Sequence, residues 1–209
     1  MSVSLFDQVV AGKTPSLLPL TVEQFHRMIE AGILRDGEPV ELIDGVLVRK
    51  DSSALGGNAM GHSARHALVV TRLQRLAERV EPHGCHIRLQ LPVTLSNVQE
   101  PEPDGSVVRG TPENYADHHP GPAQTLAVIE VADSSLEHDR TTKQRIYASA
   151  GIPQYVIVNL PDGQLEVYES PSIAEGRFVR HAIFKPGQSI RLALGSTTLI
   201  DVTVTELLP

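Results

Sequence analysis

The spacing of apolar residues predicts several short helices. Between residues 62 and 80 such residues recur every three or four positions, which places them on one face of a helix: Val69, Leu73, Leu76 and Val80. A second helix is expected from Thr21, a favourable N-terminal cap, to Gly32, a favourable C-terminal stop. A third is expected over residues 136–150, closed by Gly151 and Pro153.

Strands are predicted where apolar residues alternate, or run together, between turn-forming residues. VELI and VLVRK flank Asp44-Gly45, and QYVIVN and QLEVYE flank Asp162-Gly163, so each pair predicts a β-hairpin. Further strands are expected over residues 86–95 and 105–109, in the run TLAVIEVA, and in the tail, which ends in a helical turn. Helices interspersed with hairpins predict an α/β or α+β domain with a mixed sheet, not a purely parallel one.

The composition fits one globular domain in the cytoplasm. The chain has 209 residues, of which 41% are hydrophobic, and we expect an arm over residues 1–20 and a single domain over residues 21–209. It contains no run of about 18 apolar residues, as a membrane helix requires, and its first residues lack the pattern of a secretory signal. The single cysteine, Cys85, excludes an internal disulfide and a thiolate metal cluster. Any metal would therefore be held by oxygen or imidazole ligands.

The formal net charge of −7 argues against a protein that coats nucleic acid, because neutralising phosphates requires a basic face. A nuclease is still compatible with this charge, since acidic site residues contribute to the total. Four arginines share one face of the helix predicted after residue 62: Arg65, Arg72, Arg75 and Arg79. A solvated surface is the simpler interpretation of that face, and a stripe that contacts phosphates is the alternative.

The strongest chemical signal lies between residues 125 and 147. Glu130 projects from an otherwise apolar strand, where an ionised carboxylate is costly unless a cation or hydrogen-bond donors meet it. The alternative is a glutamate that emerges into solvent where the strand ends. Lys143 follows on the next helix, in one stripe with Asp139 and Tyr147, so its ammonium could reach the same site. An ordinary exposed pair between Asp139 and Lys143 is the structural alternative.

Three further polar residues are weaker candidates. Asp104 lies in PEPDGSVV, where prolines hold an extended entry into a strand and Gly105 lets the backbone approach closely. The tripeptide Pro-Asp-Gly is, however, also a common turn. Glu41 opens the first predicted strand and His62 opens the arginine-bearing helix, and each of these alone is more often structural.

Together these segments resemble the Uma-type family of restriction endonucleases, a branch of the PD-(D/E)XK nucleases. The resemblance rests on VELIDGVLV, the helix start at His62, PDGSVV, IEVADSSLEHDRTTKQRIYASAGIPQYVIVN and LEVYE, which occur in the family's order from about Thr21 to Tyr168. It implies a restriction-endonuclease-like α/β core, in which a mixed central sheet is flanked by helices and carries its catalytic acids on adjacent strands, here with extra β-hairpins.

The resemblance also implies a catalytic set. Asp104 and Glu130 would be the two catalytic acids and, with the backbone carbonyl of Val131, would bind Mg²⁺ or Mn²⁺. The ordinary motif carries its lysine two residues after the second acid, where this chain has Ala132. The family branch supplies the amine from the next helix, which gives that role to Lys143.

Residues around this set receive supporting roles from the resemblance. Glu41 would add an acid, His62 would be a polar neighbour, and Asp139 and Tyr147 would orient the lysine. Val156 stands where the family commonly carries tryptophan, which indicates a change in packing. The implied activity is metal-dependent endonucleolytic cleavage of nucleic acid, with DNA the expected substrate. A homodimer is also implied, since superfamily enzymes that cut both strands of a duplex often act as dimers.

Two other functions compete with this one. A protein that keeps the fold without the reaction would act as a nucleic-acid-binding or partner-binding module. A glycoside hydrolase would use Glu130 and Asp104 as its two carboxylates without a metal. The chain has no tryptophan and only 4% aromatic residues, so an aromatic sugar cleft is not expected.

Overall fold

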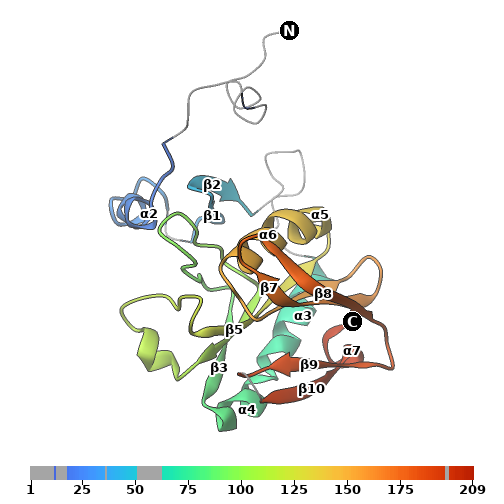
Figure 1. Cartoon of the computed structure of the whole chain (residues 1–209). Helices are drawn as coiled ribbons and strands as arrows, with labels where there is room; N and C mark the ends of the chain where they lie inside the picture. Colours follow the sequence, from blue (N-terminus) through green and yellow to red (C-terminus); the bar gives the residue numbers. More distant parts are fainter. Residues whose placement is uncertain (1–11, 13–17, 36, 51–62, 196–197) are drawn as a thin grey trace.

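The structure, a computed structural model, describes residues 12, 18–35, 37–50, 63–195 and 198–209. Six strands form its central sheet, in the order β3 (Cys85–Leu89), β4 (Gly105–Arg109), β5 (Thr125–Ala132), β6 (Gln154–Asn159), β7 (Gln164–Ser172) and β8 (Arg177–Phe184) (Figure 1). Neighbouring strands are antiparallel, except that β5 and β6 run parallel. The mixed sheet expected from the sequence is therefore present.

Helical segments and a hairpin cover the two faces of this sheet. One face packs against α3 (Ala64–Gln74), α4 (Ala77–Val80), the hairpin of β9 (Ser189–Ala193) and β10 (Leu199–Thr203), and α7 (Val204–Leu207). The other face packs against the segment formed by α5 (Leu136–His138), η4 (Asp139–Lys143) and α6 (Gln144–Ser149). Strand β5 is buried along its whole length between the two layers, as its continuous run of apolar residues predicts.

A smaller unit lies beside the segment that joins β3 to β4. It consists of α2 (Val22–Glu30) and the hairpin of β1 (Val40–Ile43) and β2 (Val46–Arg49), at the upper left of Figure 1. Thr21 caps α2 in a reciprocal pair of hydrogen bonds with Gln24, as its position in the sequence predicted. The expected hairpin turn is formed by Asp44 and Gly45, both with positive φ. Two short turns of helix, η2 (Glu81–His83) and η3 (Pro112–Tyr115), complete the described elements.

The predicted helix over residues 136–150 contains one wider turn. In η4 the backbone N–H of Gln144 donates to the carbonyl of Asp139, five residues earlier, so this turn is π-helical. The hydroxyl of Tyr155 also donates to that carbonyl, at 3.1 Å. Such turns are rare and occur frequently at functional sites. Both Asp139 and Lys143 belong to this turn, and both are buried.

The arginine-bearing face makes structural contacts. Arg72 donates to the backbone carbonyl of Leu208, and Arg79 lies 2.8 Å from a carboxylate oxygen of Glu206. These contacts fix the C-terminal segment on the helical layer. Arg72 and Arg79 are therefore engaged within the protein, and the interpretation of this face as a stripe that contacts phosphates does not hold for them.

One predicted element is shorter than expected, and two predicted segments fall mostly outside the described residues. The strand expected over residues 86–95 ends at Leu89, because Gln90 has positive φ and Pro92 follows. The arm expected over residues 1–20 and the loop before residue 62 fall mostly outside the described residues. In the part of the chain that is described, no helix is long and apolar enough to cross a membrane.

Candidate active site

Four of the residues expected at a catalytic site converge in the structure, and we call them the carboxylate–lysine cluster: Glu41, Asp104, Glu130 and Lys143. Each comes from a different segment: Glu41 from β1, Asp104 from the turn into β4, Glu130 from β5 and Lys143 from η4. All four are at least nine-tenths buried. The solvent-exposed interpretations of Glu130 and Lys143 therefore do not hold.

The ammonium of Lys143 bridges two of these carboxylates. Its Nζ donates to Oε2 of Glu41 at 2.6 Å and to Oε1 of Glu130 at 3.2 Å. Burial by itself would lower the pKa of Lys143, but the two carboxylates outweigh it and hold that pKa above its ordinary value. The amine is therefore a permanent cation at neutral pH.

Backbone hydrogen bonds fix Asp104 and Glu130 relative to each other. Oδ2 of Asp104 accepts the N–H of Val131 at 2.8 Å, and the N–H of Asp104 lies 3.3 Å from Oε2 of Glu130. These bonds form where the β4–β5 ladder ends, since its last partners are Gly105 and Ile129. In an extended strand the N–H and C=O of one residue point to the same side. The carbonyl of Val131 therefore faces the same edge as Asp104.

Burial and charge shift the pKa values of the two acids in opposite directions. The pKa of Glu130 is raised to about 7, mainly by burial and also by the neighbouring acids Asp104 and Asp139, against the attraction of Lys143. Burial would also raise the pKa of Asp104, but the contact with His66 and the N–H of Val131 lower it below its usual value.

Tyr147 and Asp139, expected to orient Lys143, act in different ways. The hydroxyl of Tyr147 donates to Oε1 of Glu130 at 2.8 Å, so it orients the acid and not the amine. Asp139 accepts from the hydroxyl of Ser135 at 2.6 Å. Burial raises the pKa of Asp139 to about 6, and the charge of Lys143 opposes that rise.

The histidine beside the site is His66, which the sequence did not single out. Its Nε2 lies 3.1 Å from Oδ2 of Asp104, and both side chains are buried. The expected neighbour, His62, lies outside the described residues. The signal that could have identified His66 is its place in the helix, three residues before Val69 of the apolar stripe and therefore near its buried face.

The donor set of the cluster matches a hard divalent cation. The cluster holds three buried carboxylates and one ammonium, and buried Asp139 adds a fourth acid near Glu130. Burying such an excess of negative charge is costly unless cations neutralise it. Carboxylate and carbonyl oxygens are the ligands that Mg²⁺ and Mn²⁺ prefer. Asp104 and Glu130, with the carbonyl of Val131 at the same edge, therefore fit such an ion.

Comparison with known proteins agrees with this architecture. The model of the Uma2 family, described as "Putative restriction endonuclease", matches residues 22–203. A crystal structure described as "a putative nuclease belonging to DUF820", from Anabaena variabilis ATCC 29413, has a similar fold, with a TM-score of 0.65. The similarity covers 90% of this chain and 97% of that one at 17% sequence identity, so it establishes the fold alone. Among curated proteins, none matches the chain.

Proposed function

The chain belongs to the Uma2 family, and from that membership and its carboxylate–lysine cluster we propose that it is a divalent-metal-dependent endonuclease that hydrolyses phosphodiester bonds. The observation that carries the proposal is a buried cluster in which Lys143 contacts Glu41 and Glu130 while Asp104 is fixed beside Glu130. A buried site with this excess of negative charge is poorly suited to stability alone. Such a site is well suited to bind a divalent cation that also contacts a phosphate of the substrate.

Asp104, Glu130 and the carbonyl of Val131 would hold Mg²⁺ or Mn²⁺. The ion supplies two things when bound: it lowers the pKa of a coordinated water, and it neutralises charge that develops on the phosphate. His66 keeps Asp104 ionised and oriented through its contact with Oδ2. The hydroxyl of Tyr147 orients one oxygen of Glu130 by donating a hydrogen bond to it.

Lys143 has the geometry of a group that stabilises the transition state. An ammonium has three N–H donors, and the described contacts use two of them, on Glu41 and Glu130. The third is available to a phosphate oxygen or to the attacking water. In the reaction, water adds to phosphorus, the bond from phosphorus to the leaving oxygen breaks, and the proton lost by the water ends on that oxygen. Positive charge fixed beforehand beside this centre lowers the barrier without reorganisation.

DNA is the proposed substrate. Cleavage of both strands of a duplex requires two sites, which a homodimer would supply. The main alternative is a protein that keeps the fold and binds nucleic acid or a partner without cutting. The cluster favours the enzyme, because a binding module gains nothing from burying several acids around one lysine.

A cleavage assay on supercoiled plasmid tests the proposal. We expect nicking or linearisation that requires Mg²⁺ or Mn²⁺ and disappears in Asp104→Asn and in Glu130→Gln. Asp133→Asn is the matched control, since Asp133 is an exposed acid just after β5 and its variant should cut like the wild type. Activity that survives a chelator, or that persists in both cluster variants, would contradict the assignment. Binding of DNA and Mn²⁺ without any cleavage would favour the silent module.

A further inference from the structure

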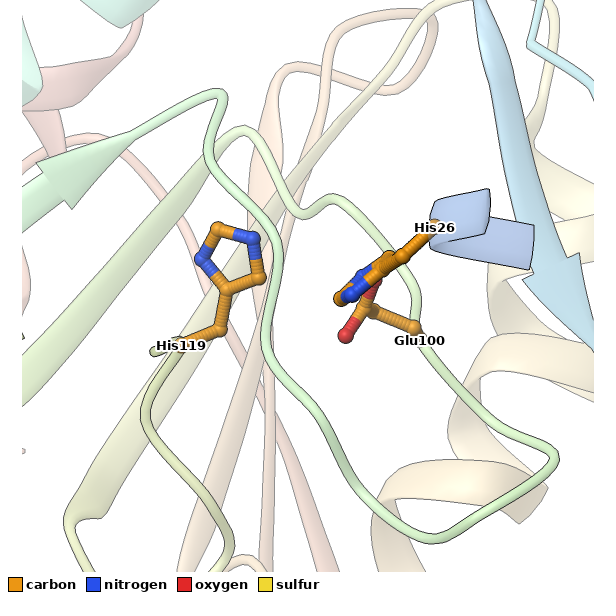
Figure 2. Close-up of side chains that lie close together, drawn as sticks. All are labelled: His26, Glu100 and His119. Atoms are coloured by element: carbon orange, nitrogen blue, oxygen red, sulfur yellow. The ribbon is translucent and has the colours of Figure 1, made fainter. Parts of the chain in front are cut away.

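A second group of metal-ligating side chains lies outside the carboxylate–lysine cluster. Figure 2 shows His26, Glu100 and His119 turned toward one another. They come from α2, from the segment between β3 and β4, and from the loop between η3 and β5. One ligand atom from each residue lies within 4.8 Å of the other two. None of the three takes part in the mechanism proposed above.

Glu100 is the buried centre of this group. Its side chain is 1% exposed, and its Oε1 lies 2.5 Å from Nε2 of His26. Its other oxygen accepts from the hydroxyl of Thr94 at 2.5 Å. The carboxylate is thus held in one orientation, with one oxygen directed at His26. A metal ion bound to both groups would replace this direct contact.

His119 completes a ligand set of two imidazoles and one carboxylate. Its ring is edge-on to that of His26, with centroids 6.0 Å apart. Coordination requires the neutral form of its imidazole. Two histidines and a glutamate are a common set for zinc, in sites that keep a further coordination position open.

The surroundings of the group are mixed in charge. The three residues line a pocket of about 420 Å³, which Glu30, Glu38, Glu102 and Arg35 also line. Lys50 already pairs with Glu102, so Glu30 and Glu38 contribute most of the negative charge. Arg88 opposes binding: its Nη2 lies 3.3 Å from Nδ1 of His119. Coordination through Nε2 of His119 would move the ring proton to Nδ1 and displace this long contact. The loss is small, because a hydrogen bond at 3.3 Å is weak.

We propose that His26, Glu100 and His119 form a second metal site, for a transition-metal ion of the zinc class, with an open coordination position toward the pocket. The ion joins three segments that are distant in the sequence. The segment that carries Glu100 is also bonded to the strand that carries Glu41 of the candidate active site. The N–H of Glu100 donates to the carbonyl of Leu42, the residue after Glu41, at 2.8 Å. Zinc is therefore expected to stabilise the unit formed by α2 and the β1–β2 hairpin, whether or not the chain cuts nucleic acid.

Zinc titration calorimetry of the full chain tests this site. The background is Asp104→Asn with Glu130→Gln, so that the carboxylate–lysine cluster no longer competes for metal. We expect one Zn²⁺ per chain, and a rise in thermal midpoint when Zn²⁺ is added. His26→Ala and His119→Ala should each weaken Zn²⁺ binding at least about tenfold, since loss of a supporting group alone costs that much.

His118→Ala is the matched control, because His118 is the exposed neighbour of His119 and its variant should bind Zn²⁺ like the background protein. Four-coordinate Co²⁺ should give an intense visible spectrum in the background protein and lose it in both ligand variants. The proposal is wrong if the double variant His26→Ala/His119→Ala binds Zn²⁺ with unchanged affinity. It is equally wrong if the background protein binds no Zn²⁺. A lower thermal midpoint in His26→Ala would then show only that the contact between His26 and Glu100 stabilises the fold.

Discussion

Replacing Lys143 by methionine removes an ammonium from between two buried carboxylates while keeping most of the aliphatic chain. The change deletes the contacts to Glu41 and Glu130, at 2.6 and 3.2 Å. Both acids are at most 5% exposed, so water cannot replace the lost charge. Removing one partner of a buried ion pair typically costs about 3–5 kcal/mol. We expect a loss of that size in the free energy of unfolding of the metal-free protein.

Urea denaturation at neutral pH in the presence of a chelator measures this loss. The matched control is Arg145→Met, two residues further along the same helical segment, where the partner Asp44 and Arg145 itself are about half exposed. An exposed pair contributes at most about 1 kcal/mol, so the control should stay close to the wild type. Equal losses in the two variants would refute the account of Lys143 as the cation that compensates the cluster.

Divalent metal should partly reverse the effect. A cation bound to Asp104 and Glu130 supplies the positive charge that Lys143→Met removes, so saturating Mn²⁺ should stabilise this variant more than it stabilises the wild type. Adding Glu41→Gln should also recover part of the loss, since it removes one of the uncompensated charges. A double-mutant cycle that shows no coupling between Glu41 and Lys143 would contradict the 2.6 Å contact.

Two further changes probe neighbouring groups. Burial would raise the pKa of Glu166, but hydrogen bonds from Arg140 and other donors outweigh it and lower this pKa to about 2. Ionised Glu166 therefore contributes stability that is present above pH 4.5 and lost as the pH falls toward 2, at most about 3 kcal/mol. In urea titrations, Glu166→Gln should lose less stability than the wild type between pH 5 and 2.5, and parallel losses would refute the reasoning. Tyr147→Phe removes the donor to Glu130, so it should cost about 1 kcal/mol of stability and reduce plasmid cleavage, and unchanged cleavage would exclude an orienting role.

Local spacing was sufficient to predict the elements that carry the site. Lys143 and Tyr147 lie four residues apart on a helix, and this geometry is a property of the backbone alone. Glu130 stands out as the one acid in a strand of buried residues. Asp44-Gly45 specifies its hairpin through the positive φ of both residues. Such features depend on neighbours in the sequence, so the sequence reveals them.

Features that depend on packing between distant segments were not predictable in the same way. The role of His66 follows from how α3 lies against the turn into β4, which brings its ring to Asp104. Arg72 and Arg79 looked solvent-facing because the C-terminal segment that they contact lies more than 120 residues away. His26 and Glu100 are separated by 74 residues, and each alone is an ordinary polar residue. Only the folded chain brings such groups together.

The proposed reaction requires that Asp104 and Glu130 hold a divalent cation. Calorimetric titration with Mn²⁺ tests it most directly, on the wild type, on Asp104→Asn, on Glu130→Gln and on the exposed control Asp133→Asn. We expect a site whose Mn²⁺ affinity is lost in both cluster variants and kept in the control. Unchanged Mn²⁺ affinity in both cluster variants would contradict it.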